Sequence, residues 1–141
     1  MRCHPALVYR EGRHCVTYLD RRAQLDPRNA ARPAPGTVLC RADEIPEHAG
    51  KSFRYRSSDD VFMGLVIRFR GEIVAYVDSC PHYGWPLAYD ADHIFSGDHL
   101  LCTGHGALFE PAGGICVAGP CLNEALTEWP ISIVDGHVVT A

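Results

Sequence analysis

Apolar and polar residues alternate over a long central part of the chain. Every second residue from Leu65 to Val77 is apolar, apart from Gly71, which follows Arg70. Alternation with a period of two is typical of a half-buried β-strand, and a short glycine-containing interruption is typical of a tight turn between two strands. We therefore predict a β-hairpin over residues 61–79 that leads directly into Cys80.

The same pattern recurs at the C-terminal end. Residues 131–134 and 137–140 flank Asp135-Gly136, and Asp-Gly between two such runs is a strong short-range hairpin signal. Shorter strands are predicted at residues 38–41, 52–56, 99–102, 107–110 and 115–117, with a turn or a single helical turn at 42–46. The strands from 99 to 117 would form a small subdomain. Since no long helix is evident, we predict an all-β domain of antiparallel sandwich or barrel type.

The N-terminal part differs from the rest in charge. Residues 1–35 hold seven arginines against three acidic residues, whereas the remainder holds six basic and fourteen acidic residues. This part has little apolar periodicity and ends in Arg32-Pro33-Ala34-Pro35, so we interpret residues 1–35 as a basic, flexible extension and residues 36–141 as the folded domain. Arg21-Arg22 is not followed by an apolar run, so we reject a twin-arginine signal. An arginine-rich transit peptide is the alternative, but the acidic residues and the internal position of the basic pair argue against it.

The length and composition are those of one small domain. The chain has 141 residues, of which 47% are apolar and 21% charged. No segment approaches the roughly 18 uninterrupted apolar residues of a membrane span, so we expect no membrane span, and we expect no nucleic-acid partner.

Two short segments each combine one cysteine with one histidine. They are Cys80-Pro81-His82 and Cys102-Thr103-Gly104-His105. A zinc finger usually takes two cysteines from one loop and two histidines from another element, whereas here each loop offers one of each. Either pair alone would be best explained as an ordinary turn with a packed thiol. Two pairs favour a metal or cluster site, with a structural zinc ion on the same four residues as an alternative that iron and sulfide analysis would separate.

The residues around these pairs resemble those of Rieske proteins. Residues 80–87 and 102–109 are similar to the first and second cluster loops of that family, and Gly119-Pro120 is similar to the third loop, a proline-bearing turn that covers the cluster. In a Rieske centre two histidines replace two of the four cysteines of a 2Fe-2S cluster. The resemblance, which spans about residues 37–140, implies the Rieske arrangement of a base sheet with an inserted cluster-binding subdomain. It also implies four ligands, which are Cys80 and Cys102 on one iron and His82 and His105 on the other.

The resemblance also indicates which residues surround the cluster. They are Gly84, Trp85, Gly104, Gly106 and Pro120, with Tyr83 and Phe109 as further packing. The glycines would let the backbone approach the cluster and leave amides free to donate to sulfur. His82 and Cys102 are separated by residues 83–101, an interval slightly longer than the family leads us to expect. We expect the extra length in a surface excursion at residues 90–98.

The ligand set affects the reduction potential. Neutral imidazoles in place of thiolates leave the oxidised cluster uncharged, which raises the potential toward the range of roughly −150 to +300 mV. Respiratory Rieske proteins add a disulfide and a serine that stabilise the reduced cluster. Here Trp85, Gly104 and Ala107 stand at those positions. The resemblance therefore implies a potential in the lower part of the range.

Five cysteines remain outside the predicted ligand set, namely Cys3, Cys15, Cys40, Cys116 and Cys121. We interpret them as reduced thiols in a cytoplasmic protein, with a Cys116-Cys121 disulfide as the alternative.

The subtype that the chain resembles most is the bacterial Rieske-type ferredoxin of ring-hydroxylating oxygenase systems. That resemblance implies single-electron transfer from a flavin-containing reductase to a terminal oxygenase, with both as transient partners and no catalytic residue in the chain itself. A terminal oxygenase would also need two histidines and a carboxylate on a mononuclear iron, and the 36 residues after His105 leave no room for such a domain. The alternatives are a small iron-sulfur subunit of a larger oxidoreductase complex, similar to that of nitrite reductases, and a redox or metal sensor.

Overall fold

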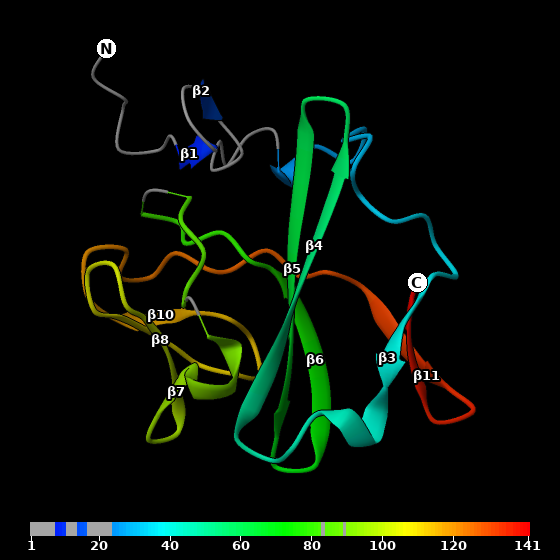
Figure 1. Cartoon of the computed structure of the whole chain (residues 1–141). Coiled ribbons are helices and arrows are strands. Elements are labelled where there is room, and N and C mark those ends of the chain that lie inside the picture. The colour runs from blue at the N-terminus through cyan, green and yellow to red at the C-terminus, as the bar shows by residue number, and fades with distance from the viewer. Residues whose placement is uncertain (1–7, 11–13, 17–23, 83, 89) are drawn as a thin grey trace.

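A computed structural model describes residues 8–10, 14–16, 24–82, 84–88 and 90–141. Every strand pair among them is antiparallel, which confirms the predicted all-β class. No helix among these residues is long and apolar enough to cross a membrane. Figure 1 shows the chain arranged as two base sheets with a smaller lobe to one side.

The first base sheet contains the predicted central hairpin. It has the order β4-β5-β6, with β4 at Ala49–Ser57, β5 at Asp60–Phe69 and β6 at Glu72–Val77. The turn falls at Arg70 and Gly71 as predicted, and both residues have positive φ, as a two-residue type I′ hairpin turn requires. Residues 61–67 of the middle strand are all buried. The middle strand is thus covered on both faces.

The second base sheet joins the C-terminal hairpin to the strand at residue 38. Its order is β11-β12-β3, with β3 at Val38–Arg41, β11 at Ile131–Val134 and β12 at His137–Thr140. These bounds agree with the prediction, and a 3-10 turn, η1 (Ala42–Glu44), follows β3. The two sheets share an apolar core that includes Phe62 and Trp129.

Trp129 takes up the space beside a glycine of the central strand. A Cβ added to Gly64 would lie only 2.0 Å from the Trp129 ring. The absence of a side chain at residue 64 therefore lets the indole pack directly against β5.

The smaller lobe is the predicted subdomain with one strand more than expected. It has the order β10-β9-β8-β7, with β7 at Phe95–Ser96, β8 at His99–Cys102, β9 at Ala107–Phe109 and β10 at Cys116–Ala118. The added strand, β7, is two residues long, too short to show a periodic pattern. A 3-10 turn, η2 (Ala91–His93), lies in the predicted excursion at 90–98, and Ala91 and Ile94 anchor it in the core while its polar residues stay exposed.

The chain leaves the base and returns to it at neighbouring points. Val77 donates its N–H to the Thr127 carbonyl (2.8 Å), and Trp129 donates its N–H to the Ala75 carbonyl (3.0 Å). The buried Tyr76 hydroxyl also donates to the carbonyl of Pro111 in the lobe (2.5 Å). The lobe is thus an insertion that is fastened at its entry and exit.

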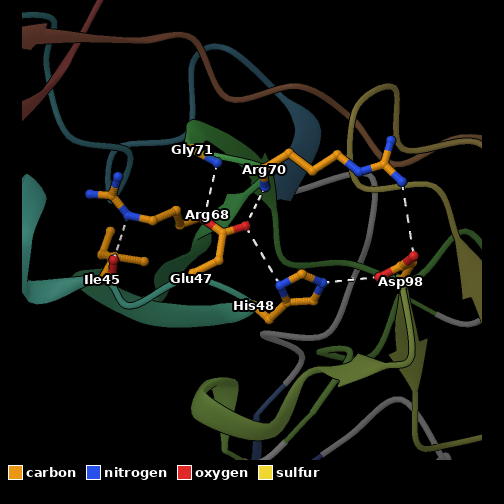
Figure 2. A network of polar contacts seen from close by, with 7 residues as sticks. All are labelled: Ile45, Glu47, His48, Arg68, Arg70, Gly71 and Asp98. Atoms are coloured by element: carbon orange, nitrogen blue, oxygen red, sulfur yellow. Dashed lines mark hydrogen bonds and ion pairs between the residues drawn. The ribbon is translucent and has the colours of Figure 1, made fainter.

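A polar network fastens the far end of the same lobe (Figure 2). His48, which directly precedes β4, lies 3.0 Å from the Asp98 carboxylate in the β7–β8 turn, and Arg70 lies 3.9 Å from the same carboxylate. Glu47 accepts hydrogen bonds from the backbone N–H groups of Arg70 and Gly71. The hydrogen bond with His48 holds the pKa of Asp98 below its usual value. These contacts connect a turn of the lobe with the β5–β6 turn, although exposed pairs of this kind contribute little free energy each.

Part of the predicted N-terminal extension is folded. Gln24 and Ala31 are buried, and the Asn29 side-chain amide donates to the Val61 carbonyl (3.0 Å). Residues 24–35 therefore pack on the base, in contrast to the predicted boundary after residue 35, because amide side chains there satisfy backbone groups of β5. The short strands β1 (Val8–Arg10) and β2 (His14–Val16) pair with each other, and residues 1–7, 11–13 and 17–23 of the predicted extension lie outside the described residues.

Candidate metal centre

The first predicted ligand loop is a compact turn at the end of β6. Cys80 donates its N–H to the Trp85 carbonyl (2.7 Å), and Gly84 donates its N–H to the Cys80 carbonyl (2.7 Å). Gly84 has a φ of 76°, in the left-handed region that favours glycine. The turn holds the Cys80 side chain on the inside, where it is 3% exposed.

The second loop connects β8 to β9 and is hydrogen-bonded to the first. Cys102 accepts the N–H of Gly106 at its carbonyl (2.9 Å), and Gly106 has a φ of 75°. Thr103 donates both its N–H (2.8 Å) and its hydroxyl (3.2 Å) to the carbonyl of Leu87 at the end of the first loop. The two loops are therefore held in a fixed relation.

The structure brings the two predicted thiol ligands together. Cys102 is 2% exposed and lies in the same buried group as Cys80. The Cys80 thiol and the backbone N–H groups of Gly104 and His105 hold the pKa of Cys102 below its usual value, while the neighbouring Cys102 and burial raise the pKa of Cys80. A thiolate is the form that binds iron, and a lowered pKa favours the thiolate.

The two predicted imidazole ligands also meet, closer to the surface. The rings of His82 and His105 lie 4.7 Å apart between centroids, at an interplanar angle of 89°. His105 is exposed and His82 half-buried, with its Nδ1 atom shielded from solvent. The thiols thus form an inner pair and the imidazoles an outer pair.

Trp85 packs beside the second loop, next to His105. Its ring centroid lies 5.8 Å from that of His105, and a Cβ added to Gly104 would lie 3.2 Å from the indole. The glycine at residue 104 is therefore explained by the close approach of the indole and not by a positive φ. Phe109 is fully buried in the core of the lobe, and Tyr83 lies outside the described residues.

The third loop packs closely against the second. Gly119 has a φ of 101°, and a Cβ there would lie 2.8 Å from the Cα of Ala107, while the next residue, Pro120, is exposed. Beside this loop the sulfur atoms of Cys116 and Cys121 lie 3.2 Å apart. A disulfide requires about 2.05 Å, so the two residues are free cysteines in this structure.

One residue of the site was not anticipated from the sequence. Asp78 is fully buried at the end of β6, and its carboxylate accepts the N–H of Leu87 (2.9 Å), which fixes the end of the first loop. Burial raises the pKa of Asp78 to about 7. The sequence shows that an acidic residue stands two positions before a predicted ligand. It does not show that this residue is buried, because the burial depends on tertiary packing.

Asp78 should make the stability depend on pH. Because its folded pKa exceeds the unfolded value of about 3.9, the folded state binds more protons between pH 4 and 7, and the free energy of unfolding should fall as the pH rises through that interval. Asp78→Asn keeps an acceptor for Leu87 and should flatten this fall. Thermal unfolding from pH 4 to 8 measures it, with Asp92→Asn as an exposed control. Parallel curves for the wild type and Asp78→Asn would contradict the assignment.

Comparisons with known proteins agree with this geometry. The family model described as the Rieske [2Fe-2S] domain matches residues 36–132. No curated protein sequence matches the chain.

Among solved structures, the ferredoxin of Sphingomonas yanoikuyae B1 is 24% identical, with a TM-score of 0.57 over 74% of this chain and 96% of that one. The ferredoxin of carbazole 1,9a-dioxygenase from Nocardioides aromaticivorans IC177 is 17% identical, with a TM-score of 0.57 over 77% and 98%. The terminal oxygenase of carbazole 1,9a-dioxygenase from Novosphingobium sp. KA1 is 21% identical, with a TM-score of 0.59 over 87% of this chain and 32% of that one. At these identities the similarity concerns the fold.

The donors present fit the cluster that the family implies. Two thiols and two imidazoles are the donor set of a Rieske centre, in which each iron takes two protein ligands. Among the described residues no three His, Cys, Asp or Glu side chains converge as a single ion would require, and the candidate ligands instead lie as one pair of thiols and one pair of imidazoles. With its family match over residues 36–132, this chain belongs to the Rieske [2Fe-2S] domain family, whose cofactor is a Rieske-type 2Fe-2S cluster.

Proposed function

We propose that the chain is a Rieske-type ferredoxin that carries single electrons, with Cys80 and Cys102 holding one iron and His82 and His105 the other. The observation that supports this most is the difference in exposure within the site. The cysteines are 3% and 2% exposed, whereas His105 is exposed and His82 half-buried. When bound, the cluster would accept and release one electron at a time, and its imidazole side would face an approaching protein.

The proposed partners are a flavin-containing reductase as donor and a terminal oxygenase as acceptor. Similar structures include one titled as a complex of reduced oxygenase and oxidized ferredoxin in carbazole 1,9a-dioxygenase, 23% identical to this chain with a TM-score of 0.58. The chain itself would bind no substrate and act in the cytoplasm as a component of an oxidoreductase system. Since residues after 35 have an excess of acidic side chains, association with both partners should weaken as salt increases.

Reduction by an isolated reductase tests this function. We expect the aerobically purified protein to be brown, to contain iron and acid-labile sulfide, and to be reduced by NADH and a flavin reductase without other subunits. We also expect a midpoint potential near or below about zero, in the lower part of the Rieske range. Co-purification with one large partner in a fixed ratio, together with no reduction by the isolated reductase, would favour a subunit of a larger complex instead.

A further inference from the structure

Two buried thiols lie in contact at the two ends of the third loop. Cys116 begins β10 and Cys121 follows Pro120, and they are 1% and 2% exposed. The Cys121 thiol donates to the Cys116 sulfur (3.2 Å), and the Cys116 thiol donates to the Ala118 carbonyl (3.1 Å). Neither residue belongs to the proposed ligand set. The pair is therefore a second group of sulfur atoms, which the proposed electron transfer does not use.

The backbone holds these two thiols next to each other. Cys116 donates its N–H to the Glu124 carbonyl (2.7 Å), and Glu124 donates its N–H to the Cys121 carbonyl (2.9 Å). Asn123 also donates its N–H to the Cys116 carbonyl (3.0 Å). Groups that are held in contact react with each other far more readily than with a second molecule. To form a disulfide of about 2.05 Å, the two sulfur atoms would need to approach by only about 1 Å.

The residues between the two cysteines form a thin cover. Val117, Gly119 and Pro120 are exposed, so local opening of this short turn is enough to let a small reagent reach the sulfur atoms. Gly119 also packs closely on the second loop, since a Cβ there would lie 2.8 Å from the Cα of Ala107. A bond between the cysteines would close a ring around this turn while it remains packed on its neighbour.

We propose that Cys116 and Cys121 form an oxidation site, at which a small-molecule disulfide such as glutathione disulfide converts the two thiols into an intramolecular disulfide. One S–S bond forms in the protein and the S–S bond of the reagent breaks. The two thiol protons and two electrons pass to the reagent, which leaves as two thiols. The reduced thiols and the disulfide that the sequence leaves as alternatives are then two states of one site. None of the proposed cluster ligands takes part in this exchange.

Equilibration of the purified, folded protein with a mixture of glutathione and glutathione disulfide tests the proposal. Free thiols are then alkylated, and the chain is digested with chymotrypsin, which cleaves after Phe109. The peptide that covers residues 110–126 contains Cys116 and Cys121 and no other cysteine. With the disulfide reagent in about fivefold excess, we expect the unalkylated, internally bonded peptide to exceed the doubly alkylated peptide at least about ninefold. Addition of dithiothreitol before alkylation should reverse this ratio.

Thermal unfolding gives a second measurement on the same samples. A ring closed by a covalent bond restricts the unfolded chain, so oxidation should raise the midpoint temperature of the wild type by about 5 °C. Cys121→Ser cannot form the bond, and its midpoint should not rise in the oxidising mixture. Cys40→Ala removes another buried thiol, in the separate core between the base sheets, and should still form the bond and show the same rise.

Three results would overturn the inference. The first is a wild-type peptide that stays doubly alkylated after equilibration in the oxidising mixture. The second is a peptide that carries glutathione as its main product, because the two thiols would then react separately. The third is a disulfide that joins this peptide to the one containing Cys80. A protein purified without a cluster would refute the proposed function instead, and the peptide could still be measured because it contains none of the proposed ligands.

Discussion

Replacing His82 or His105 with alanine should abolish the 2Fe-2S cluster. Each substitution would leave one iron with a single protein ligand, and the described residues contain no other group of three or more His, Cys, Asp or Glu side chains that could hold a metal ion. We expect the iron content to fall from about two per chain to near zero, with loss of the visible spectrum. Iron and sulfide analysis after anaerobic reconstitution gives the measurement.

His93→Ala provides the matched control for these substitutions. His93 lies in η2, its side chain is exposed, and its ring contacts the Asp90 carboxylate at 2.9 Å. Its replacement should leave the iron content and the spectrum intact. Equal loss of iron from His93→Ala and His82→Ala would show that the ligands are assigned wrongly and that any histidine removal merely unfolds the lobe.

Gly64→Ala should destabilise the base sheets strongly. Among the described glycines without positive φ, we expect the largest loss of stability on replacement with alanine at this position. The new Cβ would lie 2.0 Å from the Trp129 ring, which is packed between the two base sheets next to Phe62. The indole has no room to retreat in a close-packed core, so we expect a loss of about 3 kcal/mol in the free energy of unfolding, which denaturant titration measures.

Two further variants separate this clash from a general effect of alanine. At Gly113 the nearest atom to an added Cβ is 4.0 Å away, so Gly113→Ala should change the free energy of unfolding by less than about 0.5 kcal/mol. In a Trp129→Leu background the cost of Gly64→Ala should decrease, because the ring that it meets is gone. Additive costs in the double variant would show that the strain lies elsewhere.

The sequence predicted most of the strands because their signals are local. The alternation from Leu65 to Val77 and the Asp135-Gly136 turn depend only on neighbouring residues, and the structure confirms both hairpins. The strand β7 was missed because two residues cannot show a period. The packing of residues 24–35 was also missed, since Gln24 is a polar residue whose burial depends on its hydrogen bond to Met63 of another segment (3.3 Å).

In the candidate site, too, the features that depend on local sequence were predicted and those that depend on tertiary contacts were not. Spacing along the chain identified the Cys80-His82 and Cys102-His105 pairs, which the structure brings together as thiols and imidazoles. The role of Asp78 could not be predicted, because it arises from a contact with Leu87 that no local pattern encodes. The sequence alone therefore predicts the candidate metal ligands better than the residues that hold the ligand loops in place.

The backbone bonds from Val77 to Thr127 and from Trp129 to Ala75 place the two ends of the lobe side by side on the base. An inserted segment whose two ends lie side by side can be replaced by the corresponding segment of a related protein, because segments of different length can be joined to the same two neighbouring positions. Grafts that span residues 78–127 should accordingly transfer redox properties from one member of the family to another, provided that the Tyr76 hydroxyl still finds a carbonyl that accepts its hydrogen bond.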